Sequence, residues 1–120
     1  MKTFGDLVKD LQNIEANMEQ AKDHLLKSVG SELLEEVKDR TPVDNGDLKD
    51  AWHLEFDKDA MWLLNKQDYA GYVEFGHRTR GGNNYVPGVF MLRDAKDTVR
   101  NNMDSHIDMF WGMVLPTSRG

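Results

Sequence analysis

A metal site needs ligands at a fixed spacing, and the histidines of this 120-residue sequence lack that spacing. The four histidines fall on four separate predicted elements, at His24, His53, His77 and His106. No pair has the His-x-x-x-His spacing that places two imidazoles on one helical face for zinc. The sequence also has no cysteine, which removes thiolate ligands and disulfides and suits a reducing cytoplasm. We therefore predict that the protein has no metal site.

The densest group of carboxylates, Asp44, Asp47 and Asp50, lies in one predicted loop and raises the question of a calcium site. Calcium loops of the EF-hand type follow the order D-x-[DN]-x-[DN]-G with a later glutamate, and this segment does not. Turns and helix caps made by aspartate side chains explain the group more simply. We predict that these aspartates shape the loop and hold no cation.

Nucleophilic catalysis has no readable template in the sequence either. The serines lie on predicted helices or in the terminal tail, outside any G-x-S-x-G turn, at Ser28, Ser31, Ser105 and Ser118. Gly81-Gly82 is too short for a phosphate-binding loop, and neither a Walker motif nor a dinucleotide-binding motif occurs. We predict that the protein is not an enzyme, has no catalytic residue and uses no cofactor.

The segment 77–88 offers a different kind of chemistry, because it is a basic island in an acidic chain. It contains His77, Arg78 and Arg80 and no carboxylate. Its glycines and asparagines predict an irregular loop, and arginine and tyrosine are enriched at interface hot spots. Three hypotheses follow: an arm that docks on an acidic patch of a neighbour, an arm that touches packaged DNA phosphate, or a solvated loop without a specific partner.

The composition limits the remaining classes of function. A hydrophobic share of 39% and a charged share of 30% are typical of a folded globular protein, and 120 residues fit one domain, 1–120. The net charge of -6 argues against a general nucleic-acid binder, because phosphate binding needs a surplus of lysine and arginine. The sequence shows no signal-peptide core, and no apolar run approaches the ~20 residues that span a membrane. We expect a protein that is made in the cytosol and stays soluble.

A long helix is predicted over residues 1–40. From Leu7 to Leu25 the apolar residues alternate between spacings of four and three, which is a heptad pattern. Beyond Leu25 the spacing changes to fours, which is typical of an amphipathic helix on a domain core. Thr3 is expected to cap the start of the helix, and Thr41-Pro42 to end it. Such a helix is roughly 55 Å long, so its heptads either pack within the chain or contact another subunit.

Residues 41–90 are predicted to form a small antiparallel sheet with loops. Large apolar and polar residues alternate through a hairpin over residues 51–65. A short helix is predicted between Asp68, as its N-cap, and Gly76. The fold class is therefore α+β: a long N-terminal helix, a small antiparallel β-sheet, a short helix, and a C-terminal amphipathic helix over 91–115 that packs on the sheet.

Three segments in order along the chain together resemble a family of tailed-phage proteins. Residues 41–52, TPVDNGDLKDAW, are similar to its TPVDTG-x-L-(R/K)-x-S-W segment, with Asn45 for the usual threonine and Ala51 for the common serine. Residues 69–78, YAGYVEFGHR, look like its YA-x-YVEFG(T/H)-R, and residues 86–95, VPGVFMLRDA, like its (V)PG-x-(F/Y)ML-x-x-A. The family is that of the head–tail joining, or tail-completion, proteins, and the resemblance covers roughly the whole chain.

This resemblance implies a structural subunit of the neck of a tailed phage, a prophage or a phage-derived particle. Its partners would be identical copies in a ring, the head-connector protein, and the tail-terminator or tail-tube protein, with no membrane and no specific nucleic acid. It would be made in the bacterial host cytoplasm and located in the neck or tail of the virion. The alternative is a small phage-encoded regulator that binds nucleic acid through the basic segment 77–88.

The motifs also supply the candidate site residues. One set is expected to shape turns and core: Thr41, Pro42, Val43, Asp44, Gly46, Leu48, Trp52, Gly76, Pro87 and Gly88. A second set is the predicted subunit interface: Tyr69, Tyr72, Glu74, Phe75, His77, Arg78, Arg80 and Tyr85. Tyrosine suits such an interface because it combines an apolar ring with a polar tip that tolerates a wet boundary.

Overall fold

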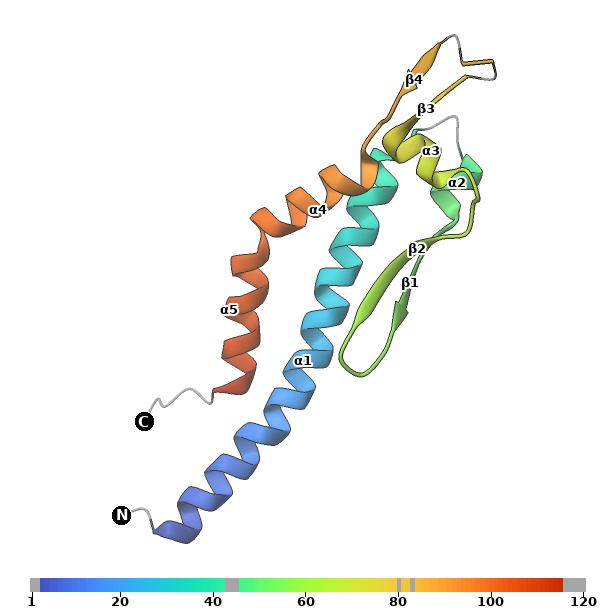
Figure 1. Ribbon diagram of the computed structural model, residues 1–120. Coiled ribbons are helices and arrows are strands. Elements are labelled where there is room, and N and C mark those ends of the chain that lie inside the picture. Colours follow the sequence, from blue (N-terminus) through green and yellow to red (C-terminus); the bar gives the residue numbers. More distant parts are fainter. Residues whose placement is uncertain (1–2, 43–45, 80, 83, 116–120) are drawn as a thin grey trace.

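The longest element, α1 (Phe4–Arg40), contains 37 residues, and the other elements attach along its sides (Figure 1). Thr3 caps it as predicted, because Asp6 N donates to Thr3 Oγ1 at 3.1 Å and Thr3 N donates to Asp6 Oδ2 at 3.0 Å. The helix ends at Thr41, whose extended backbone precedes a proline. The computed structural model describes residues 3–42, 46–79, 81–82 and 84–115.

The molecule is a rod, with principal extents of 78 × 23 × 22 Å (Figure 1). Its radius of gyration is 20.8 Å, whereas a compact domain of this length would have about 14 Å. The helix α1 alone spans about 55 Å of that length. A rod has more surface for its volume than a sphere, so many large apolar side chains remain exposed to solvent.

The predicted hairpin is present, with β1 (Trp52–Phe56) antiparallel to β2 (Met61–Asn65). One face of this sheet packs on α1. Gly30 marks the closest approach, because a Cβ at that position would lie 3.3 Å from side-chain atoms of both Leu54 and Met61. The glycine therefore allows the helix to sit directly against the sheet.

A second two-stranded sheet lies where the sequence predicts an irregular loop over 77–88. The strand β3 (Gly76–Arg78) pairs antiparallel with β4 (Tyr85–Pro87). Beyond the strands, Thr79 N donates to Asn84 O at 2.7 Å. Each strand has only three residues, too few to show an alternating pattern in the sequence. We call β3, β4 and the described residues between them the arm, because they project from one end of the rod (Figure 1).

Two short helices complete the middle of the chain. The helix α2 (Gly46–Asp50) lies inside the segment that was predicted as a loop. The helix α3 (Ala70–Phe75) confirms the predicted short helix, and Gly76 ends it as expected. Its N-cap is Tyr69 without a side-chain hydrogen bond, so the prediction that Asp68 caps this helix is wrong.

The predicted C-terminal helix over 91–115 is broken into α4 (Met91–Asn101) and α5 (Met103–Val114). The break falls at Asn102, whose side-chain amide donates to Glu32 Oε1 of α1 at 2.8 Å. Asparagine favours such positions because its side chain competes for hydrogen bonds with the helix backbone. Both helices pack along α1, on the side away from the β1–β2 hairpin in Figure 1.

A small core joins the helices to the first sheet. Its buried members are Val37, Leu48, Trp52, Met91 and Ala95. They come from α1, α2, β1 and the start of α4, so the C-terminal helical region meets the first sheet at the start of α4. The core lies near the arm end of the rod, and the arm is therefore attached to the best-packed part of the molecule.

Candidate functional site

The first motif converges on the hydroxyl group of Thr41. Its Oγ1 donates to Val37 O at 2.6 Å and accepts a hydrogen bond from Trp52 Nε1 at 2.9 Å. Thr41 is only 3% exposed, and Leu48 is completely buried in the same core cluster as Val37 and Trp52. A buried indole N–H needs such a partner, because an unpaired buried donor costs about 1–3 kcal/mol. These three motif residues therefore hold the end of α1 against α2 and β1.

The other residues of this motif lie nearer the surface or outside the described part of the chain. Pro42 is half-buried directly after α1, and Gly46 is exposed at the start of α2. Val43 and Asp44, which were expected to shape the turn, lie outside the described residues.

Two glycines let the second and third motifs touch. Gly76 has a φ of +85°, and a Cβ there would overlap Tyr85 Oη and the backbone of Gly88. A Cβ on Gly88 would in turn overlap Glu74 O. Pro87 stands opposite Gly76 in the arm, where the missing proline N–H is tolerated at the edge of a short sheet. Gly76, Pro87 and Gly88 thus form the tightly packed root of the arm.

Glu74 is buried at this root, with 5% of its surface exposed. Its carboxylate accepts hydrogen bonds from Leu92 N at 2.7 Å and from Arg93 N at 3.0 Å. The N-cap residue of α4, Phe90, has left-handed backbone angles and makes no side-chain cap, so Glu74 replaces the missing cap from another helix. We therefore leave Glu74 out of the proposed contact surface and assign it to the support of the arm.

The remaining aromatic and basic residues of the second set lie on the outside. Tyr72 is 62% exposed, Phe75 65% and Tyr85 60%. Tyr85 is also anchored, because its hydroxyl donates to Phe75 O at 2.7 Å. The exposed members of this set come from α3 with its N-cap and from the arm that follows it. We call them together the arm surface: Tyr69, Tyr72, Phe75, Arg78 and Tyr85.

Two further residues of the predicted interface differ from the arm surface. His77 is half-buried, and its ring lies against that of Tyr72 with 5.4 Å between the ring centroids. Its Nδ1 is buried and has no hydrogen-bond partner among the described residues. Arg80 lies outside the described part of the chain.

A groove beside the arm root contains residues that the sequence reasoning missed. Its volume is about 320 Å³. Its lining includes three cations of α4, Arg93, Lys96 and Arg100, together with the carboxylate of Asp97 and the rings of Phe75 and Phe90. Arg93 stacks over the Phe90 ring at 4.0 Å from its centroid. The sequence could have predicted this basic face of the helix, because the three cations recur at spacings of three and four on a predicted helix.

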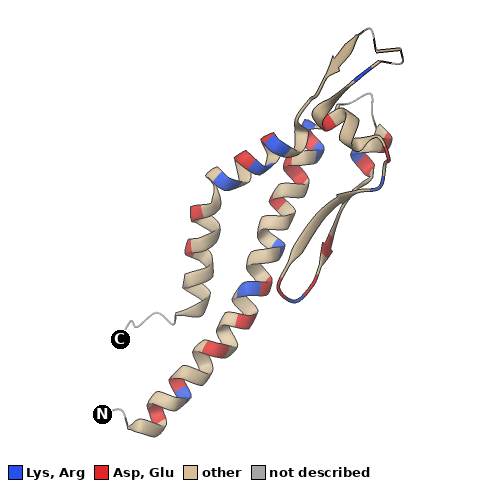
Figure 2. Cartoon of the chain, in the orientation of Figure 1, with Lys and Arg blue, Asp and Glu red and all other residues tan. Residues whose placement is uncertain are grey.

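Charge is distributed unevenly along the rod (Figure 2). Basic residues occur in the arm and along α4, where Asp94 and Asp97 pair with two of them, and the opposite end of α1 is mainly acidic. Within residues 3–42, 46–79, 81–82 and 84–115, no cluster of three or more histidines and carboxylates is placed to hold a metal ion. No helix in those ranges combines the length and apolar character needed to cross a bilayer.

These features define a class of protein: an elongated α+β chain in which three motifs build a rigid base for an exposed aromatic and basic surface. The chain belongs to the HK97-gp10-like family, described as "Bacteriophage HK97-gp10, putative tail-component", whose model matches residues 5–76. That range includes the whole first motif and most of the second. No curated protein and no solved structure matches the chain.

The predicted resemblance to a tailed-phage structural family is thereby confirmed. Membership supports a structural role in a phage particle, a location in the virion, and contacts with other phage structural proteins. The family is described by its place in the particle and not by a reaction.

Proposed function

We propose that this chain is a structural subunit of a tailed-phage neck, in which identical copies form a ring that joins the head connector to the tail. The observation that carries the proposal is the arm surface. Three aromatic side chains there are each at least 60% exposed, and contiguous exposed apolar groups of this kind mark interaction sites. Tyrosine and arginine are also the residue types that most often dominate binding energy.

The residues beneath the arm surface hold it in place, which favours a contact that forms without a change in the conformation of the arm. Glu74 fixes the start of α4, and Gly76 and Gly88 bring the two strand ends into contact. A surface held in its binding conformation loses less conformational entropy on association. The arm is therefore suited to fit a neighbouring subunit or the adjacent protein of the neck.

The rod shape suits side-by-side packing of identical copies about a central axis. Contacts between different faces of identical subunits give closed rings when the rotation between them closes. In this proposal the whole chain, residues 1–120, acts as one domain, and its neighbours are identical copies, the head-connector protein and the tail-terminator or tail-tube protein. It performs no reaction, is made in the host cytoplasm and resides in the neck.

The test is complementation of a phage that lacks this protein with the variant Tyr72→Ser/Arg78→Glu. Both side chains are exposed, so circular dichroism is expected to show an unchanged fold. We expect separate heads and tails by electron microscopy and a titre reduced on the order of 100-fold or more, because two hot-spot residue types are lost. Lys66→Glu is the matched control, because it reverses an exposed charge away from the arm. A normal titre from the double variant would contradict the proposal.

One observation favours a second candidate, the nucleic-acid-binding regulator. The arm carries Arg78, and α4, which follows the arm in the chain, carries three further cations; Figure 2 shows basic positions on both elements. The carboxylates of Asp94 and Asp97 lie beside two of those cations and weaken their attraction for phosphate. A salt-titrated binding assay, described in the Discussion, separates the two functions.

A further inference from the structure

The groove beside the arm root adjoins a second hollow along α4. This second hollow has a volume of about 230 Å³ and lies between α1, α4 and the first residue of α5. The two hollows adjoin because Lys96 and Arg100 line both of them. We call the two hollows together the α4 groove.

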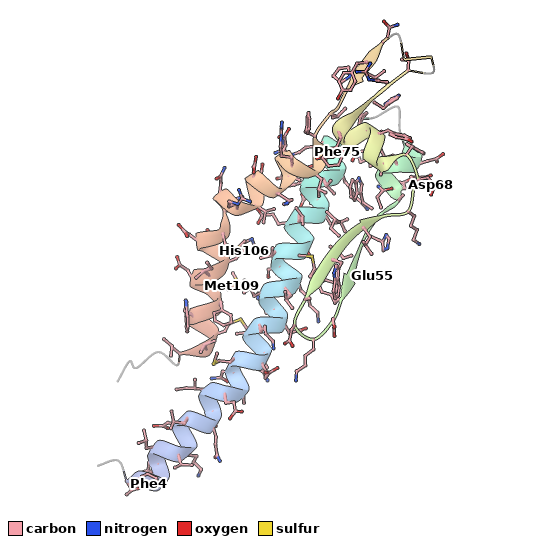
Figure 3. The ribbon with its side chains drawn as sticks, viewed as in Figure 1. Phe4, Glu55, Asp68, Phe75, His106 and Met109 are labelled. Atoms are coloured by element: carbon pink, nitrogen blue, oxygen red, sulfur yellow. The ribbon has the colours of Figure 1, made fainter. Side chains whose placement is uncertain are left out.

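The α4 groove is apolar at both ends. At the arm root, the rings of Phe75 and Phe90 meet edge to face with 6.5 Å between their centroids. Figure 3 labels Phe75 where α3 meets the start of α4. The other end is lined by apolar side chains of α1, α4 and α5: Val29, Leu33, Val99 and Met103. From Phe90 to Met103 the groove is roughly 20 Å long at 1.5 Å per residue, which an extended chain of about six residues spans.

The middle of the α4 groove is basic and has hydrogen-bond donors without partners. Lys96 is exposed, and within the described part of the chain it makes no ion pair and no hydrogen bond. Arg93 donates to Asp94 Oδ1 through Nε alone, at 3.2 Å. Arg100 Nη1 lies 3.6 Å from Asp97 Oδ1, which is too far for a hydrogen bond. A guanidinium group has five N–H donors, so both arginines keep donors for a ligand.

The charge of the lining is positive on balance. The groove beside the arm root is lined by three cations and by the carboxylates of Glu74 and Asp97. The Glu74 carboxylate already accepts two backbone amides of α4. Among the described residues, those that line the second hollow include no carboxylate. A ligand that covers this groove removes water from its cations, and only a negative group on the ligand compensates for that loss.

We propose that the α4 groove binds an extended acidic segment of a neighbouring virion protein. The carboxylates of the segment face Lys96 and Arg100, and an apolar side chain at each end fills an apolar end of the groove. This inference rests on the proposed neck function and names the chemistry of one partner. Because Phe75 belongs to both the arm surface and the groove, the segment and the arm surface contact the partner side by side.

A protein segment fits the α4 groove better than DNA does. The DNA backbone presents phosphates at a regular spacing and has no apolar group for the two ends of the groove. The carboxylate of Asp97 also interrupts the row of cations, at 3.6 Å from Arg100. A peptide places its few carboxylates beside the cations and leaves an uncharged residue beside Asp97.

The first experiment selects ligands from a displayed library of random peptides of about 12 residues, twice the length that spans the groove. We expect enrichment of peptides in which Asp or Glu lies between aromatic or aliphatic residues. The same selection against Lys96→Glu/Arg100→Glu is expected to lose these peptides. A selection without acidic enrichment, or one that gives the same peptides with the variant, would overturn the proposal.

The second experiment measures the affinity of a synthetic form of the most enriched peptide by fluorescence anisotropy. Lys96→Gln/Arg100→Gln removes two exposed cations without adding charge, so circular dichroism is expected to show an unchanged fold. We expect binding weakened on the order of tenfold or more, because two charge-assisted contacts are lost. Replacing the carboxylates of the peptide by amides should weaken binding similarly.

Two control variants locate the peptide on the chain. Lys66→Gln removes an exposed cation away from the groove and should leave the affinity unchanged. The arm-surface variant Tyr72→Ser/Arg78→Glu should also bind the peptide. Equal affinities of the wild type and Lys96→Gln/Arg100→Gln, or a loss of binding in the arm-surface variant alone, would overturn the proposal.

The third experiment separates the groove from the neck function. The natural chain has no cysteine, so Asp97→Cys carries a single thiol in the groove for a photo-activated cross-linker. In phage particles we expect a cross-link to an acidic segment, flanked by apolar residues, of another virion protein. A cross-link to DNA, to a second copy or to a segment without carboxylates would overturn the groove proposal and leave the neck function standing. A chain that binds the acidic peptide but never enters particles would overturn the neck function and leave the peptide specificity of the groove supported.

Discussion

The carboxylate of Glu74 accepts a hydrogen bond from the backbone amide of Leu92 at 2.7 Å, across 18 residues of sequence. Glu74 lies in α3, before the arm, and Leu92 lies in the first turn of α4, after it. The bond therefore closes the base of the arm. A second bond from the amide of Phe90 to the carbonyl oxygen of Glu74, at 3.0 Å, reinforces the same closure.

Removing this carboxylate should destabilise the fold. Glu74→Ala leaves two part-buried backbone amides of α4, those of Leu92 and Arg93, without an acceptor, at a cost of about 2 kcal/mol. Glu74→Gln keeps one acceptor oxygen and should cost about half as much. Urea unfolding followed by circular dichroism measures both, with the exposed Glu35→Ala on α1 as the control. Equal unfolding midpoints for Glu74→Ala and Glu35→Ala would contradict the assigned role.

Replacing glycines by alanine distinguishes two effects on stability: the steric overlap of an added Cβ, and the higher helix propensity of alanine. At Gly88 an added Cβ would overlap the backbone of Glu74 and Phe75, so Gly88→Ala is expected to cost about 2 kcal/mol or more. Gly71 lies in α3 with open space around it, so Gly71→Ala should be neutral or stabilising by up to about 1 kcal/mol. Thermal unfolding distinguishes the two. A tolerant Gly88→Ala variant would show that the arm root is less tightly packed than described.

The contact between Glu32 and the break at Asn102 predicts a pH dependence. The Asn102 amide and, less strongly, the His106 ring hold the pKa of the Glu32 carboxyl below its ordinary value of 4.5. Because the folded-state pKa is lowered, the ionised carboxylate stabilises the fold above pH 4.5, and this contribution is lost as the pH falls through the lower folded value.

The variant Glu32→Gln tests this dependence. The difference in unfolding free energy between wild type and variant should be largest near about pH 6 and shrink toward about pH 3. Glu35→Gln, on the same helix and exposed, controls for the loss of a charge. If the difference is constant over this range, the carboxylate of Glu32 does not stabilise the packing of α5 on α1.

Binding to DNA should be weak and governed by salt. The net charge of -6 and the carboxylates beside the α4 cations oppose phosphate binding. We expect no sequence-dependent retention of duplex DNA near physiological salt, measured by fluorescence anisotropy with increasing sodium chloride. Tight retention that is lost in Arg78→Glu and kept in Lys66→Glu would favour the regulator instead.

Local signals predicted the regular elements well. Heptad spacing and the Thr3 cap identified α1, and the alternation from Trp52 onward identified the first hairpin. The break at Asn102 and the strands of the arm were missed. The helix α4 ends at Asn102, whose side-chain amide binds Glu32, seventy residues away in sequence. The strand β3 begins at Gly76, whose backbone packs closely against that of Gly88. Contacts across such separations leave no local periodicity.

The sequence predicted where the candidate site lies, but not which of its residues are exposed for contact and which support the fold. The sequence analysis placed Glu74 among the interface residues because it belongs to the motif YAGYVEFGHR, together with Tyr72 and Phe75, which are exposed in the structure. Only the fold shows that a carboxylate is needed there, because α4 begins at Phe90 without a cap of its own. Conversely, Tyr85 is both exposed and anchored through its hydroxyl, a combination that no sequence pattern expresses.

The most direct test of the neck function is an electron cryomicroscopy map of the head–tail junction of a particle that contains this chain. The account predicts a ring of identical copies at the junction, with the rings of Tyr72 and Tyr85 buried against a neighbouring chain. Density for this chain elsewhere in the particle, or a ring whose arm surfaces all face solvent, would contradict it.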